Sequence, residues 1–214
     1  EIMALETFSR SKVDGIVLMA TTLTAQHLEV IDKIDVPVIL VGQAHDKLHS
    51  VIHDDYQAGQ LVGTRIGQQQ LREACFFGVS EDDIAVGVKR KQGIIDELHA
   101  YKIKPRLFKT SFQYEEAMRD VAEVLKDLPK MDVLIGATDS IALAIHKYCS
   151  ESGDSSDMPQ IYGFGGDPMT QLVSPTIKTV KFNYFEAGKQ AMKQLHELIF
   201  SKNVVQETVL SIEI

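Results

Sequence analysis

The stretch VLIGATDSIALAI, residues 133–145, decides the fold class, because an apolar run changes into a helical pattern within a few residues. Residues 133–135 are typical of a strand buried on both faces, and the apolar residues from Ile141 onward have the spacing of a helix. Asp139 lies at the turn between the two. Its carboxylate has two compatible roles open to it: capping the helix, or accepting a hydrogen bond from a ligand, since ligands of open α/β sheets gather at the carboxyl ends of strands.

The same alternation of strand and helix continues along the chain. We expect strands at 16–19, 38–41, 75–77, 133–135, 160–164 and 179–182, with intervening helices that include 84–101, 114–128, 139–150 and 185–201. Such alternation is typical of parallel α/β architecture. Because no flexible linker is visible, a protein with two lobes would cross between them on strands, and the candidate crossings are 53–54, 182–183 and 204–205.

A second strand-to-helix turn has a basic sequence, VGVKRKQG, residues 86–93. On a helix, Lys89, Arg90 and Lys91 point in different directions, so at most two of them face one site. Arg90 is then either part of a solvated basic helix start or a fork of donors for vicinal hydroxyls, a carboxylate or a phosphate. Together, Arg90 and Asp139 can bracket a polyhydroxylated ligand such as a sugar.

The composition of the chain and the motifs that it lacks argue against several other functions. The net charge of −8 disfavours this chain as a nucleic-acid surface, and no apolar run approaches the ~20 residues that cross a bilayer. The first residues show no secretory leader, and the two cysteines, Cys75 and Cys149, read as reduced thiols of a cytoplasmic protein. We find no nucleophile motif and no paired acid and base, so we expect neither an enzyme nor a cofactor. His45 and His49 lack the helix that a zinc motif needs, so we expect no metal site either.

Several segments, in this order, resemble the effector-binding core of the lactose/galactose repressor (LacI/GalR) family. They are RSKVDGIVL at 10–18, VPVILV at 36–41, DDYQAG at 54–59, RKQG at 90–93, ATDSIALA at 137–144, SPTIKTV at 174–180 and EAG at 186–188. The resemblance implies a periplasmic-binding-protein-like α/β fold with parallel sheets, two lobes, three crossings and a ligand in the cleft between the lobes. It also implies a homodimer and an N-terminal helix-turn-helix, outside this chain, that binds operator DNA.

The resemblance also assigns site residues. Arg90 matches the family's cleft arginine, Thr138 and Asp139 match its Asn-Asp pair, Phe182 and Tyr184 match cleft positions at the second crossing, and Phe112 resembles the aromatic residue that lines the sugar. The lobes are expected at 1–53 plus 183–204 and at 54–182 plus 205–214. The first of these is expected to be incomplete, because the chain begins at what resembles the second helix of that lobe.

One departure from the family's usual sequence narrows the range of ligands that we expect. The family's usual carboxylate after Gly-Tyr or Gly-Phe is replaced by Gly165, as in the sucrose and trehalose repressor subgroup. Loss of that carboxylate also removes a repulsive charge, so an anionic sugar is accepted more easily. We therefore expect the core of a cytoplasmic repressor, not bound to a membrane, that senses sucrose, fructose or a sugar phosphate. The alternative is a periplasmic-type sugar-binding protein that serves a transporter.

Overall fold

The computed structural model describes residues 1–152, 158–200 and 204–213. The chain forms two compact units, which we call unit 1 (Glu1–Asp54 and Asn183–Ser211) and unit 2 (Asp55–Phe182 and Ile212–Ile214). It passes between them after Asp54, after Phe182 and after Ser211. The last passage differs from the expected position at 204–205, because the residues that follow 205 form a further strand in the sheet of unit 1.

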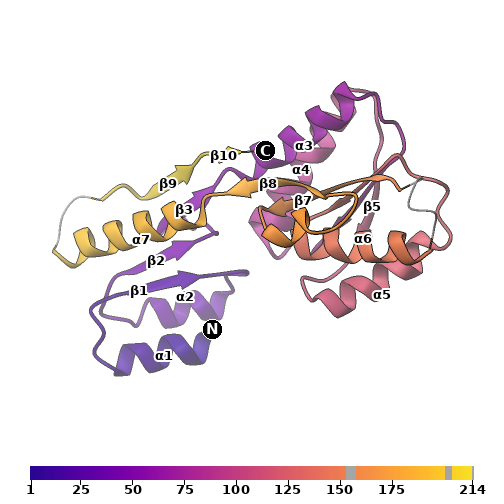
Figure 1. Cartoon of the computed structure of the whole chain (residues 1–214). Coiled ribbons are helices and arrows are strands. Elements are labelled where there is room, and N and C mark those ends of the chain that lie inside the picture. The colour runs from indigo at the N-terminus through magenta and orange to yellow at the C-terminus, as the bar shows by residue number, and fades with distance from the viewer. Residues whose placement is uncertain (153–157, 201–203, 214) are drawn as a thin grey trace. The chain divides into compact units, whose positions relative to one another are not determined.

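Unit 1 is built on a four-stranded parallel sheet in the order β1-β2-β3-β9. Its elements are α1 (Ile2–Arg10), β1 (Ile16–Met19), α2 (Ala25–Ile31), β2 (Val38–Val41), β3 (His49–His53), α7 (Tyr184–Ile199) and β9 (Glu207–Leu210) (Figure 1). The helix expected to run to residue 201 ends at Ile199, and residues 201–203 lie outside the described part of the chain.

Apolar side chains on the strands of unit 1 point alternately to the two faces of the sheet and form two apolar layers. Ile16, Leu18, Val38 and Leu40 belong to the cluster that includes Leu5 of α1 and Ile31 of α2. Their neighbours Ile39 and Val51 instead pack with Ala187, Ala191 and Leu195 of α7. Successive side chains of a strand point to opposite faces, so α1 and α2 cover one face of the sheet and α7 covers the other.

Unit 2 is built on a six-stranded sheet in the order β10-β8-β7-β6-β4-β5. The strands are parallel except β10, which pairs antiparallel with β8. The elements are α3 (Asp55–Gln68), β4 (Ala74–Gly78), the π-helical turn η1 (Ile84–Arg90), α4 (Lys91–Ala100), β5 (Arg106–Lys109), α5 (Tyr114–Leu125), β6 (Val133–Gly136), α6 (Asp139–Ser152), β7 (Gln160–Gly165), the 3-10 turn η3 (Pro168–Gln171), β8 (Lys178–Phe182) and β10 (Ile212–Glu213). Helices α3 and α4 pack together on one side of the sheet, and α5 and α6 on the other (Figure 1).

Close contact between α3 and α4 positions the functional end of unit 2. A Cβ atom on Gly59 of α3 would overlap the carbonyl oxygen of Arg90, and one on Gly93 of α4 would overlap that of Tyr56. The two backbones therefore touch directly, which only glycine permits. This contact fixes the start of α4 against the start of α3, where the side chains of Arg90 and Asp55 meet.

Most expected elements are present within two or three residues of their predicted bounds, and the expected parallel α/β fold is confirmed. The sequence analysis gave no bounds for β3, β5, β9 or β10. It expected a helix at the start of the chain, which is α1, without giving its bounds. No helix among the described residues is long and apolar enough to span a membrane.

Candidate ligand-binding site

The candidate site lies in unit 2 at the carboxyl edge of its parallel strands. The segment after β4 leads into η1 and Arg90, the segment after β6 leads to Asp139, and Phe182 ends β8. Because parallel strands end at one edge of the sheet, segments that are far apart in sequence meet there.

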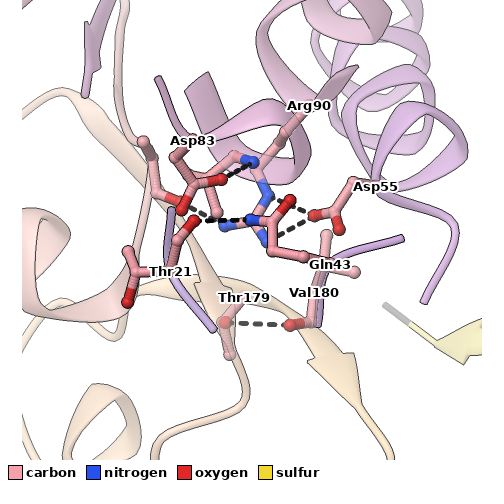
Figure 2. Close-up of polar contacts among 9 residues, drawn as sticks. Thr21, Gln43, Asp55, Asp83, Arg90, Thr179 and Val180 are labelled. Carbon is pink, nitrogen blue, oxygen red and sulfur yellow. Dashed lines mark hydrogen bonds and ion pairs between the residues drawn. The ribbon is translucent and has the colours of Figure 1, made fainter. Parts of the chain in front are cut away.

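Arg90 is the central cation of this edge, and it is buried, with 5% of its surface exposed. Its Nε and Nη2 donate to Asp55 Oδ1 at 2.9 and 2.5 Å, and its Nη1 donates to the carbonyl oxygen of Ala137 at 2.5 Å (Figure 2). These bonds use three of the five guanidinium N–H groups. The geometry fixes the fork and leaves further N–H groups beyond these three bonds. Because Arg90 is buried, the alternative of a solvated helix start is wrong for it.

Two aromatic rings lie against this guanidinium. Its central carbon is 4.8 Å from the ring centroid of Phe164 and 5.0 Å from that of Phe182. Such cation–π contacts stabilise a buried guanidinium and hold its plane. Phe182 was expected at the site from the sequence, whereas Phe164, the residue before Gly165, was not.

Asp139 is buried at the first residue of α6 and is tied to two other segments. Its Oδ1 accepts from the hydroxyl of Thr179 at 2.6 Å, and its Oδ2 accepts from the backbone N–H of Asp167 at 2.7 Å. Burial raises the pKa of the Asp139 carboxyl, although these two hydrogen bonds act to lower it. The carboxylate, which follows β6, thus joins the segment that follows β7 to Thr179 within β8.

The helix cap belongs to Thr138 rather than to Asp139. The hydroxyl of Thr138 accepts from the backbone N–H of Ile141 at 3.3 Å, and its carbonyl accepts from that of Ala142. The expectation that Asp139 caps α6 is therefore wrong, because Asp139 is already the first helical residue and its carboxylate bonds other segments. Its expected role toward a ligand stays a prediction.

The other two expected aromatic residues lie elsewhere. Phe112 follows β5, which is separated from β8 by three strands of the sheet, and it is about one-third exposed. Tyr184 belongs to unit 1, where it is exposed and its ring meets that of His53 edge to face at 5.7 Å. Unit 2 therefore brings Arg90, Thr138, Asp139 and Phe182 to one edge, and the ligand roles of Phe112 and Tyr184 remain predictions.

Unit 1 has its own polar contacts at the carboxyl ends of its strands. Gln43, which follows β2, donates from Nε2 to the carbonyl oxygen of Thr21, which follows β1, at 2.9 Å (Figure 2). This hydrogen bond joins two adjacent loops of unit 1 and orients the buried amide of Gln43. The sequence analysis did not single out either residue.

Asp55, Phe164 and Thr179 are the site residues of unit 2 that sequence reasoning missed. One usable signal was the spacing of Gly59, Gly63 and Gly67 on α3, which places three glycines along one face and indicates a closely packed partner helix. Gly165, where the family usually has a carboxylate, adopts φ 143°, and Gly166 adopts φ 79°. These conformations favour glycine, so the backbone at this edge matches the departure seen in the sequence.

Comparison with known proteins agrees with this architecture. The periplasmic binding protein domain model matches residues 1–203. The sucrose operon repressor of Staphylococcus xylosus is 57% identical over 213 residues, which cover 100% of this chain and 67% of that protein. The chain belongs to the lactose/galactose repressor family. The resemblance expected from the sequence is thus confirmed, and the chain spans about two thirds of the length of this relative.

Solved structures of the same fold include a repressor and a transport protein. The trehalose repressor from Escherichia coli has a TM-score of 0.86 at 26% identity, covering 99% of this chain and 81% of that one. A periplasmic solute-binding protein of an ABC transporter from Actinobacillus succinogenes 130z, with bound D-allose, has the same TM-score at 16% identity, covering 99% of this chain and 79% of that one. The second likeness shows the shared fold alone, so the family assignment depends on the repressors.

Proposed function

We propose that this chain is the effector-binding core of a sugar-responsive transcriptional repressor, with sucrose, fructose or a phosphorylated sugar as its ligand. The observation that supports this most is the 57% identity with a sucrose operon repressor over the whole chain. A sequence this similar folds alike and keeps the chemical character of its site far more often than a chain related by fold alone.

The geometry of Arg90 supports a sugar ligand. The guanidinium is fixed by Asp55 and Ala137 and still has N–H groups beyond those three bonds. Paired N–H donors suit the vicinal hydroxyls of a sugar or the oxygens of a phosphate. The rings of Phe164 and Phe182 add apolar surface of the kind that packs against the C–H face of a sugar.

As a repressor, the whole protein would convert sugar binding into a change in operator affinity. The ligand must bind the operator-competent and released states unequally, typically by about 1–3 kcal/mol of coupling. We propose a cytoplasmic homodimer whose operator DNA is bound by an N-terminal helix-turn-helix outside this chain. The protein then acts by binding rather than by catalysis.

A thermal-shift panel on the intact chain tests the proposal. Sucrose, fructose, trehalose and their 6-phosphates are added in turn, and a true ligand at a hundred times its Kd should raise the melting temperature by about 5–10 °C. The test variant is Arg90→Lys, which keeps the charge beside Asp55 but loses the fork. Arg119→Lys, at an exposed position of α5, is the matched control.

The expected result is a shift with one sugar that Arg119→Lys retains and Arg90→Lys loses. Arg90→Ala is a poor test, because it would leave the Asp55 carboxylate buried without its partner. If none of these sugars raises the melting temperature, the proposed ligand class is contradicted. If the melting temperatures of both variants rise equally, Arg90 does not contribute to ligand binding.

A further inference from the structure

We propose that unit 2 has a second, anion-binding site for a small phosphate monoester, in a pocket away from Arg90. The pocket has a volume of about 310 Å³ and is lined by residues that include Arg65, Gln69, Tyr162, Lys178, Thr179 and Lys181. This volume lies at the lower end of the range for small-molecule sites. A concave site of this size suits a metabolite rather than a flat protein surface.

The charge of the pocket is its most unusual property, because the chain as a whole has a net charge of −8. Three cations line it, Arg65 from α3 and Lys178 and Lys181 from β8, and the described residues that line it include no carboxylate. Among the described residues, none of these three cations forms an ion pair. Glu213 of β10 is in register with Lys181 but makes no such pair with it. The positive potential is therefore available to a bound anion.

Hydrogen bonds hold the floor of the pocket in place. The hydroxyl of Tyr162, a residue that is 1% exposed, accepts from Gln69 Nε2 at 3.1 Å. Gln69 Oε1 in turn accepts from Gln160 Nε2 at 2.9 Å, and Gln160 Oε1 accepts from Lys178 Nζ at 2.5 Å. This chain of neutral amides orients the Lys178 ammonium, which lies 5.3 Å from the Tyr162 ring centroid, without neutralising it.

The pocket and the Arg90 site use different groups of unit 2. Arg90 is bonded to Asp55 and Ala137, and neither residue lines the pocket. One residue touches both networks: Thr179 lines the pocket, and its hydroxyl donates to Asp139. An anion in the pocket would thus lie next to the hydrogen bond that orients Asp139.

A dianionic phosphate group is the ligand chemistry that these residues favour. A guanidinium and two ammonium groups provide several charge-assisted donors, which bind phosphate oxygens more strongly than neutral donors bind neutral oxygens. Because the lysines and Arg65 are exposed, the attraction is screened by salt.

A titration of the intact chain with inorganic phosphate tests this site. Two-dimensional ¹H–¹⁵N spectra are recorded at constant ionic strength, at a pH where the phosphate is dianionic. We expect saturable shifts of the amide signals at residues 65–69 and 177–181. Glycerol 3-phosphate in the same titration should move the same signals and bind more tightly, since the proposed ligand is a monoester rather than free phosphate.

The test variant is the double substitution Lys178→Met/Lys181→Met. Its control is Lys104→Met/Lys126→Met, which removes the same charge at exposed positions elsewhere in unit 2. The first should weaken phosphate binding at least about tenfold and the second should change it little. If the double variant fails to fold, Arg65→Gln takes its place in the test, and we expect this variant to weaken phosphate binding severalfold. Shifts that do not saturate, or equal Kd values in the two double variants, would overturn the proposal; shifts confined to residues around Arg90 would do the same.

Discussion

Among single residues, the ion pair between Arg90 and Asp55 has the largest energetic consequence, because their side chains are only 6% and 8% exposed. Removing one partner leaves the other charge buried and uncompensated, which costs roughly 3–5 kcal/mol. We expect Asp55→Asn and Arg90→Gln each to lower the free energy of unfolding by such an amount, and the double variant to lose clearly less than their sum. Urea unfolding of the four proteins measures this coupling. Additive losses would show that the two residues do not act as a pair.

A second prediction at this scale concerns pH. Burial raises the pKa of Asp139 in the folded protein above its ordinary value of 3.8. The folded state therefore binds this proton more readily than the unfolded chain, and the contribution of Asp139 to stability falls as the pH rises through the raised pKa. We expect the unfolding free energy of the wild type, minus that of Asp139→Asn, to fall over this acidic range and to be constant above it. A difference that increases with pH would contradict the assignment.

The individual site residues were predictable only in part. Arg90 and Asp139 were found because each lies where a strand-like run gives way to a helical pattern, a position visible in a short window of sequence. Their partners Asp55 and Thr179 are 35 and 40 positions away along the chain. Such pairings arise from the order of strands in the sheet, which local patterns do not contain.

Between helices, the contact of α3 with α4 predicts opposite outcomes for two glycine substitutions. Gly59→Ala would place a methyl group on the backbone of Arg90 and should destabilise the protein by about 1–3 kcal/mol. Gly188→Ala is the control, because a Cβ there meets nothing within 4 Å and α7 gains a better helix former, worth about 0.5–1 kcal/mol. Urea midpoints of the two variants distinguish them. Equal effects would mean that the helices separate easily.

Elements were predictable where burial is strong on both faces. The central strands β4 and β6 are buried along their whole length, so each appears in the sequence as an unbroken apolar run. Strand β5, with the sequence RLFK, lies at the sheet edge and is mostly exposed, and β9 alternates exposed and half-buried residues. Such strands form because a neighbouring strand offers a free edge, a cause that their own residues do not show.

For the molecule as a whole, the two cysteines report how often unit 2 opens. Burial raises the pKa of Cys75 to about 12 and that of Cys149 to about 11, so neither reacts as a thiolate at neutral pH while unit 2 stays folded. In a Cys149→Ser variant, we expect a thiol reagent to label Cys75 only as fast as unit 2 opens. The sugar that binds, at a hundred times its Kd, should slow this labelling about a hundredfold. An unchanged rate would mean that Cys75 becomes accessible without release of the sugar.

The last described residues have a consequence for how this protein can be handled. Residues 207–210 add a strand to the edge of the sheet in unit 1, and residues 212–213 add one to the edge of the sheet in unit 2. Loss of residues 207–213 would therefore expose the edges of β3 and β8 together. Newly exposed strand edges pair with other chains, so we expect protein that has lost residues 207–213 to aggregate on storage.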